Sequence, residues 1–170
     1  MTRDQWLQER QTCIGASDAA AIMSESPWKS RYALWAEKVH GIETTEESER
    51  MKWGLLLEPA ISDAFTQWAE ENLDSFTHVS PDGNGRVIRR HPEYDFLGAT
   101  LDRLVYAGDD LIGVLEIKTP DGRNHADWQD GPPLYYQIQV QHQLMVTGLP
   151  MGWIAVLIGG NQFRVFECPR

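Results

Sequence analysis

Apolar residues near the start of the chain recur at the spacing of short helices. Residues 3–11 predict one short helix, and an alanine-rich helix follows, for which Ser17 or Asp18 is a suitable N-cap. Ser26-Pro27-Trp28 ends this second helix because proline cannot continue the backbone hydrogen-bond ladder.

Two further helical patterns occupy the next stretch. The first ends at Gly41 and has its apolar positions at Tyr32, Leu34, Trp35 and Val39. An acidic stretch over residues 43–49 leads into a longer pattern with apolar positions at Met51, Leu55, Ile61, Phe65 and Trp68. Pro59 either kinks this long helix or begins a second one.

The pattern changes after Asn72 to short apolar runs separated by turns. Strands are expected at residues 76–80, 86–91, 96–100, 104–107 and 111–118, with turns at 81–85 and 108–110. A helix over 134–147 is closed by Gly148, and strands 153–158 and 163–166 are joined by Gly159-Gly160-Asn161. This order predicts a mixed central sheet flanked by helices, an α+β or α/β arrangement.

The size and composition indicate one globular domain over residues 1–170. Hydrophobic residues make up 42% of the chain and charged residues 24%, as in ordinary soluble proteins. No apolar run approaches the length of a bilayer span, and the polar opening of the chain does not resemble a signal peptide. We therefore expect a cytoplasmic protein of a bacterial or phage-infected cell that makes no membrane contact.

The net charge of −10 argues against binding to nucleic acid by diffuse attraction. Ten of the acidic residues fall within residues 43–82, where Arg50 and Lys52 are the only bases, so a local basic surface elsewhere is compatible with the sequence. Cys13 and Cys168 are far apart and are expected to be buried free thiols. No histidine or cysteine spacing is typical of a zinc or iron–sulfur site.

The clearest candidate chemistry lies around two strands. Glu116 and Lys118 alternate along a strand that is otherwise apolar, so they share one face. Asp102 is expected at the turn between two strands of a hairpin, which could bring it beside Glu116. Two adjacent carboxylates with no histidine or cysteine favour Mg²⁺ or Mn²⁺. The alternative is a Glu–Lys surface pair on an edge strand. Four glutamines within seven residues of the following helix make its face unusually polar and favour the metal-site interpretation.

Several short motifs in this order resemble the YqaJ-type viral recombinase nucleases, the lambda exonuclease group of the PD-(D/E)xK superfamily. The motifs are Trp6…Arg10…Ile14–Ala20, Ser26-Pro27-Trp28, Gly54…Glu58-Pro59, Gly98–Asp102, Glu116–Lys118 and Gln139…Gly148. The resemblance covers about residues 6–160 and implies a restriction-endonuclease-like core.

The resemblance also implies roles for particular residues. Asp102 and Glu116 match metal-binding carboxylates, with the Ile117 carbonyl and Glu58 as further ligands. Lys118 matches the catalytic lysine. Gln139 matches the motif glutamine, and Tyr136 lies one turn before it. The positions that hold a 5′-terminal phosphate are Arg10, Ser17 and Thr100.

Three of these residues also have a purely structural interpretation. Ser17 is a suitable N-cap, Arg10 a surface charge, and Glu58 a favourable residue at a helix start. A serine near a helix start and an arginine are equally suited to an anion. Basic residues at Arg86, Arg89 and Arg90 fit either a phosphate backbone or a solvated strand. The tryptophans Trp28, Trp35, Trp53 and Trp68 are expected in the core.

Two positions depart from the family pattern. Leu101 and Arg103 flank Asp102 where the family commonly has proline and glycine, and neither change removes a ligand. The chain also stops at Arg170, where relatives continue with a helix.

The resulting hypothesis is a Mg²⁺-dependent (or Mn²⁺-dependent) 5′→3′ exonuclease that degrades one strand of linear double-stranded DNA in phage-type recombination. By resemblance it would form a toroidal trimer and pass the exposed strand to an annealing protein. The alternatives are a structure- or site-specific endonuclease of the same superfamily and a non-catalytic DNA-binding or assembly protein on a degenerate nuclease fold.

Overall fold

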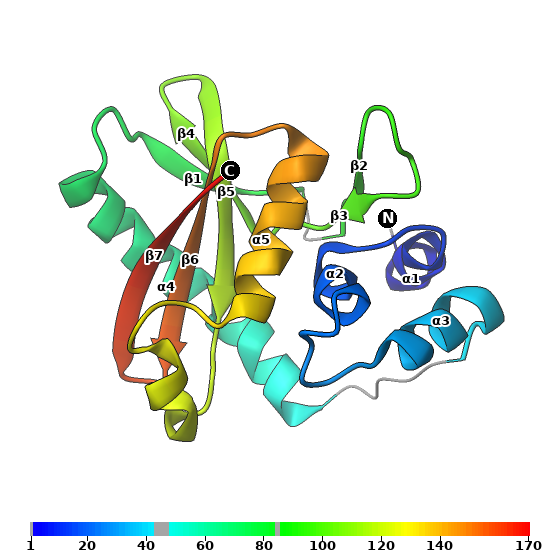
Figure 1. The fold of residues 1–170 in the computed structure, drawn as a ribbon. Helices are drawn as coiled ribbons and strands as arrows, with labels where there is room; N and C mark the ends of the chain where they lie inside the picture. Colours follow the sequence, from blue (N-terminus) through cyan, green and yellow to red (C-terminus); the bar gives the residue numbers. More distant parts are fainter. Residues whose placement is uncertain (1, 43–47, 84–85) are drawn as a thin grey trace.

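A five-stranded mixed sheet with helices on both faces forms the centre of the molecule (Figure 1). The structure, a computed structural model, describes residues 2–42, 48–83 and 86–170. The first part of the predicted acidic stretch (residues 43–47) and the end of the predicted turn at 84–85 lie outside the described residues. The strand order is β1-β4-β5-β6-β7.

The secondary structure follows the predicted order closely. The helices are α1 (Arg3–Gln11), α2 (Ala16–Ile22), α3 (Arg31–His40), α4 (Glu49–Asn72) and α5 (Leu134–Thr147), with a 3₁₀ helix η1 (Gly122–Trp128) before α5. The strands are β1 (His78–Pro81), β2 (Arg89–Arg90), β3 (Gly98–Ala99), β4 (Arg103–Ala107), β5 (Asp110–Lys118), β6 (Met151–Ile158) and β7 (Gln162–Pro169). Gly41 and Gly148 end α3 and α5 in the left-handed conformation, as predicted.

One parallel pair organises the sheet. β5 and β6 run parallel, and the chain crosses between them through η1 and α5, whereas β1, β4 and β7 add antiparallel neighbours. The crossover places α5 on one face of the sheet, where Val140 and Leu144 are fully buried. On the other face α4 buries Ile61 and Phe65 against the same strands. The sheet is therefore covered on both sides around β5.

Two local predictions need correction, and the alternatives left open at Pro59 are resolved in favour of one helix. The N-cap of α2 is Gly15, because the Asp18 carboxylate folds back to accept a hydrogen bond from the Gly15 amide at 3.0 Å. Residues 49–72 form one helix with Pro59 inside it, held by the burial of its apolar face on the sheet. The expected strands 86–91 and 96–100 shrink to the two-residue β2 and β3, which pair only with each other.

The expected burial of four tryptophans is wrong for three of them. Trp28, Trp35 and Trp53 expose 66%, 48% and 56% of their surface, and only Trp68 is packed against the α4 side of the core. Trp128 and Trp153 are the tryptophans that are buried. Helical spacing alone cannot distinguish an aromatic stripe that faces the core from one that faces solvent. Both cysteines are buried and free, as expected.

Candidate active site

The pairing of β4 with β5 brings Asp102 beside Glu116. Arg103 pairs with Leu115, so Asp102, just before β4, reaches the end of β5, where its Oδ2 accepts a hydrogen bond from the Ile117 amide at 2.8 Å. Lys118 lies on the same face of β5 as Glu116 and donates a short hydrogen bond to Glu116 Oε1. The predicted juxtaposition of Asp102, Glu116 and Lys118 is therefore present.

Helix α5 supplies two amide donors to the same carboxylate. Gln139 Nε2 donates to Glu116 Oε1 and Gln143 Nε2 donates to Glu116 Oε2, each at 2.5 Å. Glu116 is 3% exposed and Gln143 1%. Sequence reasoning identified Gln139 and missed Gln143. The sequence signal for Gln143 was its position four residues after Gln139, because this spacing places both amides on one helix face.

The buried charges shift the pKa values of this cluster. Burial, together with repulsion from Glu116, raises the pKa of the Asp102 carboxyl to about 8. Burial lowers the pKa of Lys118, but attraction to Glu116 and Asp102 outweighs it and leaves that pKa above its ordinary value. Two carboxylates thus share one lysine, and a bound cation would relieve their repulsion.

Glu58 on α4 faces the same site through an ion pair. Arg103 Nη1 lies 3.4 Å from Glu58 Oε2 and also donates to the Asp102 carbonyl oxygen at 2.7 Å. Burial raises the pKa of Glu58 above its ordinary value, although Arg103 opposes this shift. Arg103, which departs from the family pattern, thus connects the two candidate ligands Glu58 and Asp102.

Tyr136 lies beside the lysine rather than beside the carboxylates. The Lys118 ammonium is 4.9 Å from the centroid of the Tyr136 ring, close enough for a cation–π contact. Burial raises the pKa of the Tyr136 hydroxyl. The Tyr136 ring also stacks on Trp128 of η1, with 5.4 Å between the ring centroids.

The residues expected to bind phosphate lie in one cavity with the carboxylates. This cavity of about 720 Å³ is bordered by Arg10, Ser17, Thr100, Asp102, Glu116, Gln139 and Glu58, among others. Arg10 Nη2 lies 3.5 Å from Ser17 Oγ, and the Arg10 guanidinium stacks over the Trp6 ring at 4.7 Å. The Trp6 indole donates to Thr100 Oγ1 at 3.3 Å. Trp6, to which sequence reasoning assigned no role, therefore joins the other three side chains.

The three candidate arginines, Arg86, Arg89 and Arg90, make different contacts. Arg89 makes a bidentate pair with Asp82, at 2.8 and 2.9 Å, and Arg90 donates to Thr12 at 2.7 Å. Arg86 borders the cavity described above. Of the three, Arg86 is therefore the best placed for a phosphate.

The donor set of the site fits a hard divalent cation. Carboxylates and a backbone carbonyl, with no histidine or cysteine, are the oxygen ligands that Mg²⁺ and Mn²⁺ prefer. Within residues 2–42, 48–83 and 86–170, no three Asp, Glu, His or Cys side chains already converge as a ready-made metal cluster. Glu58 is paired with Arg103, so its participation requires that this ion pair open.

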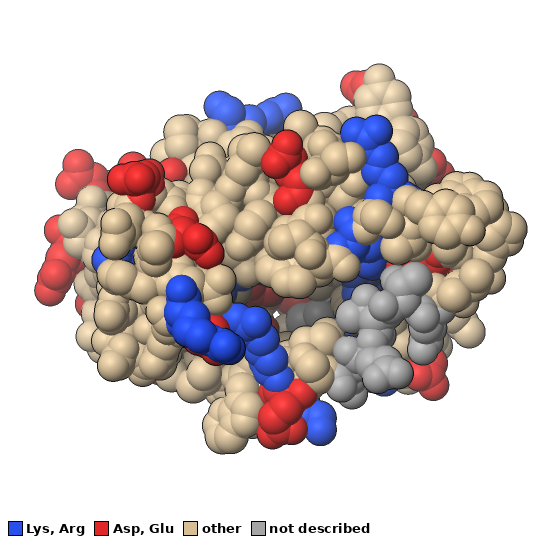
Figure 2. Space-filling view, turned by 60° about the horizontal axis from the view of Figure 1, so that its bottom comes forward, with Lys and Arg blue, Asp and Glu red and all other residues tan. Residues whose placement is uncertain are grey.

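The surface of the described residues lacks one large basic face on the side shown in Figure 2. Lys and Arg side chains form separate groups there, and acidic side chains gather toward the left end of the view. No helix in the described part of the chain is long and apolar enough to cross a bilayer.

Comparisons with known proteins identify a family and several similar proteins. The chain matches the YqaJ-like viral recombinase domain over residues 5–150. It is 38% identical over 174 positions to the uncharacterised protein YqaJ of Bacillus subtilis, which covers all of this chain and 51% of that protein. Protein D345L of African swine fever virus is 26% identical over 159 positions, covering 85% and 45%. The chain thus spans about half the length of these relatives.

The fold is similar to that of the alkaline exonuclease LHK-Exo from Laribacter hongkongensis, with a TM-score of 0.71 and 24% identity, covering 98% of this chain and 82% of that one. A structure of the same enzyme in complex with dAMP gives a TM-score of 0.69 at 23% identity and the same coverage. This likeness confirms the predicted fold, a mixed central sheet flanked by helices. Because the family match covers most of the chain and the identity to YqaJ extends over all of it, the chain belongs to the YqaJ-like viral recombinase domain family.

Proposed function

We propose that this chain is a Mg²⁺- or Mn²⁺-dependent deoxyribonuclease that degrades one strand of linear duplex DNA from its 5′ end in phage-type recombination. The observation that carries this proposal is the cluster of Asp102, Glu116 and Lys118, of which the two carboxylates border the same cavity as Arg10, Ser17 and Thr100. Membership of the recombinase family and likeness to an exonuclease fold support it.

The cation would be held by Asp102, Glu116, the Ile117 carbonyl and Glu58. When bound, it supplies an activated water and stabilises negative charge on the phosphate. Glu116 keeps its orientation through the amides of Gln139 and Gln143, so the carboxylate needs little rearrangement.

Lys118 is the candidate for charge neutralisation at the scissile phosphate. Its raised pKa keeps the ammonium protonated at neutral pH, and its attachment to Glu116 holds it next to the oxygen ligands. A fixed positive charge beside a phosphate that gains negative charge lowers the barrier because no reorganisation is needed. Tyr136 restricts the position of the ammonium from the other side.

The terminal phosphate would bind between Arg10, Ser17 and Thr100. The guanidinium of Arg10 offers paired donors to phosphate oxygens, and its stacking on the Trp6 ring fixes the plane of the guanidinium. The two hydroxyls add neutral donors. Helix α2 is short, and Asp18 occupies the Gly15 amide. The helix terminus therefore contributes less to this pocket than the side chains do.

The resemblance extends the proposal to assembly. A toroidal trimer around DNA would allow basic residues to line a channel while acidic surfaces face outward, which reconciles a net charge of −10 with a DNA substrate. The exposed single strand would then pass to an annealing protein.

Site variants test the proposal. Asp102→Asn, Glu116→Gln and Lys118→Met should each reduce Mg²⁺-dependent degradation of linear duplex DNA by about 100-fold or more. Asp109→Asn, an exposed carboxylate in the β4–β5 turn, is the matched control and should retain activity. Thermal unfolding should show that the variants are folded. Cleavage by Glu116→Gln at the wild-type rate would contradict the mechanism.

A further inference from the structure

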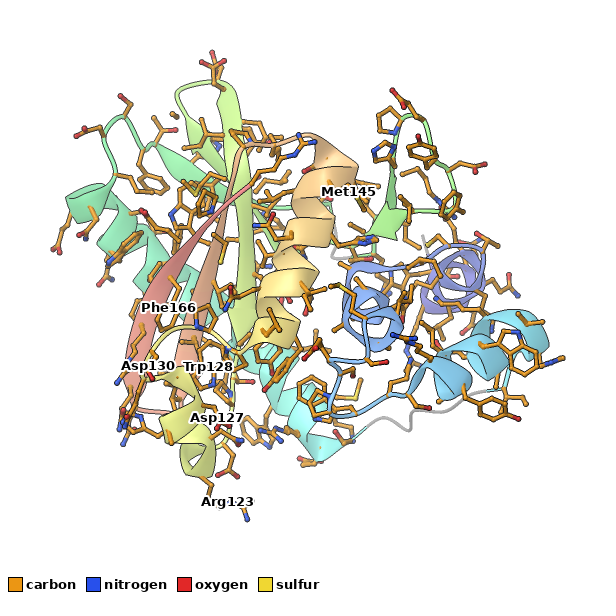
Figure 3. The ribbon with its side chains drawn as sticks, viewed as in Figure 1. Arg123, Asp127, Trp128, Asp130, Met145 and Phe166 are labelled. Atoms are coloured by element: carbon orange, nitrogen blue, oxygen red, sulfur yellow. The ribbon has the colours of Figure 1, made fainter. Side chains whose placement is uncertain are left out.

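A second cavity, of about 500 Å³, lies next to the candidate active site. It is bordered by Trp28 in the α2–α3 connection, Arg50 at the start of α4, residues of η1, and Tyr135 and Tyr136 at the start of α5. Figure 3 shows Asp127 and Trp128 of η1 below the N-terminal end of α5. The two sites meet at Tyr136, which borders this cavity and whose ring also contacts Lys118.

Trp28 is 66% exposed, yet its position is fixed by neighbouring groups. Its ring packs edge-on against Tyr135, with 4.8 Å between the ring centroids. The centroid of the Tyr136 ring is 5.8 Å away. Ser26 Oγ accepts hydrogen bonds from the amides of Trp28 and Lys29, and Lys29 Nζ is bound to Glu37 at 2.6 Å. The Trp28 ring is mostly exposed on a loop that these hydrogen bonds hold in place, so it does not contribute to the core. Such a ring offers a stacking surface at low entropic cost.

The chemistry of this cavity fits a nucleotide. Exposed aromatic rings stack on nucleobases regardless of sequence, and a guanidinium at the rim pairs with the phosphate that joins the bases. Arg50 provides that positive charge on the rim, and its charge acts on both tyrosine hydroxyls. Trp28 and Arg50 thus supply the two elements that bind single-stranded DNA elsewhere.

We propose that this cavity is a subsite for one nucleotide of the DNA strand being degraded, with its base stacked on Trp28 and its phosphate at Arg50. This inference rests on the proposed function. The first cavity, with Arg10, Ser17 and Thr100, also contains the carboxylates, and the second is joined to them through Tyr136, which contacts both Trp28 and Lys118. Because the 5′ phosphate would lie in the first cavity, a nucleotide in the second would be on the 3′ side of the scissile phosphate.

The test measures binding separately from cleavage. A 5′-phosphorylated single-stranded oligonucleotide with a 3′ fluorophore is titrated in EDTA and followed by anisotropy. A second oligonucleotide carries abasic sites at the second to fourth nucleotides. The variants are Trp28→Ala, Trp28→Phe and Arg50→Gln. Trp35→Ala is the matched control, because Trp35 is also exposed, its ring contacts within the described residues are with Tyr32 and His40, and it is not among the residues that border either cavity.

We expect Trp28→Ala to weaken binding of the intact oligonucleotide about tenfold, and Trp28→Phe and Trp35→Ala to weaken it less than twofold. On the abasic oligonucleotide Trp28→Ala should have no effect. Arg50→Gln should reduce the slope of log affinity against log salt by about 0.7.

Equal losses for Trp28→Ala on both oligonucleotides, or equal losses for Trp28→Ala and Trp35→Ala, would overturn the subsite. If the wild-type protein degrades DNA in Mg²⁺ while the variants give either of these results, only this inference fails. A wild-type protein that neither binds nor degrades DNA refutes the proposed function and the subsite together.

Discussion

At the residue scale, Glu116 is the centre of the site. Its two carboxylate oxygens accept hydrogen bonds from Lys118, Gln139 and Gln143, so one buried acid connects strand β5 with helix α5. Asp102, Glu116 and Lys118 were predictable because strand alternation and hairpin pairing are local rules. Gln143 was missed, because only the packing of α5 against β5 shows that its amide is buried against Glu116. The pattern of glutamines indicated a polar helix face without showing which amide is buried.

Replacing Gln143 should therefore affect both stability and activity. Gln143→Leu leaves Glu116 Oε2 with one donor fewer in a buried position, which should cost about 1–3 kcal/mol and reduce DNA cleavage. Gln137→Leu is the control on the same helix, because Gln137 is exposed and its side-chain bond is to the Pro132 carbonyl. Urea unfolding and cleavage rates measure the two effects. Equal behaviour of the two variants would remove Gln143 from the site.

Stability should also depend on pH through His142. This side chain is buried, Nε2 donates to the Gly98 carbonyl oxygen at 3.0 Å, and burial lowers its pKa below 6.5. The unfolded chain takes up the proton first, so stability should decline as the pH falls below about 6.5, by at most about 1.4 kcal/mol per pH unit. His142→Gln should flatten this decline in urea titrations, whereas the exposed His40→Gln should not. An unchanged slope in His142→Gln would contradict this assignment.

At the element scale, the types and order of the elements were predictable, and the pairing and exposure were not. Helix α5 occupies the predicted residues 134–147, because its apolar period and terminal glycine are local signals. β2 and β3 are shorter than predicted because strand length depends on a partner. Of the neighbouring residues, Leu97 bridges to Ile14 instead of extending β3. The exposure of Trp28 likewise depends on how α2, α3 and α5 are arranged.

The contact of α5 with β6 should be sensitive to small additions. A Cβ at Gly152 would overlap with Val140 Cγ1 on α5. Gly152→Ala should therefore cost about 1–3 kcal/mol and lower cleavage, because α5 carries Gln139 and Gln143. In the double variant with Val140→Ala, the loss in free energy of unfolding should be smaller than the sum of the two single losses. Strict additivity would show that the two positions do not compete for space.

At the scale of the whole molecule, charge and geometry bear on the proposed function, which expects recognition of DNA ends. The net charge of −10 and the separated basic groups in Figure 2 give no continuous track for a DNA backbone on that face. The cavity with Arg10, Ser17 and Thr100 instead concentrates phosphate donors at one point beside the carboxylates. The net charge of −10 could predict that the molecule as a whole attracts DNA weakly at most. The position of the local pocket required the approach of α1 and α2 to the β3–β4 connection.

The most direct test of a 5′-end-dependent nuclease compares three DNA substrates in Mg²⁺: linear duplex with a 5′ phosphate, linear duplex with a 5′ hydroxyl, and a closed circle. We expect the phosphorylated linear strand to be degraded fastest, at least tenfold faster than the hydroxyl form, with the circle intact and all cleavage abolished by EDTA. Arg10→Gln should remove the preference for phosphate. Cleavage of the circle, or equal rates on both linear ends, would contradict end recognition through Arg10, Ser17 and Thr100, and no cleavage of any substrate would contradict the nuclease itself.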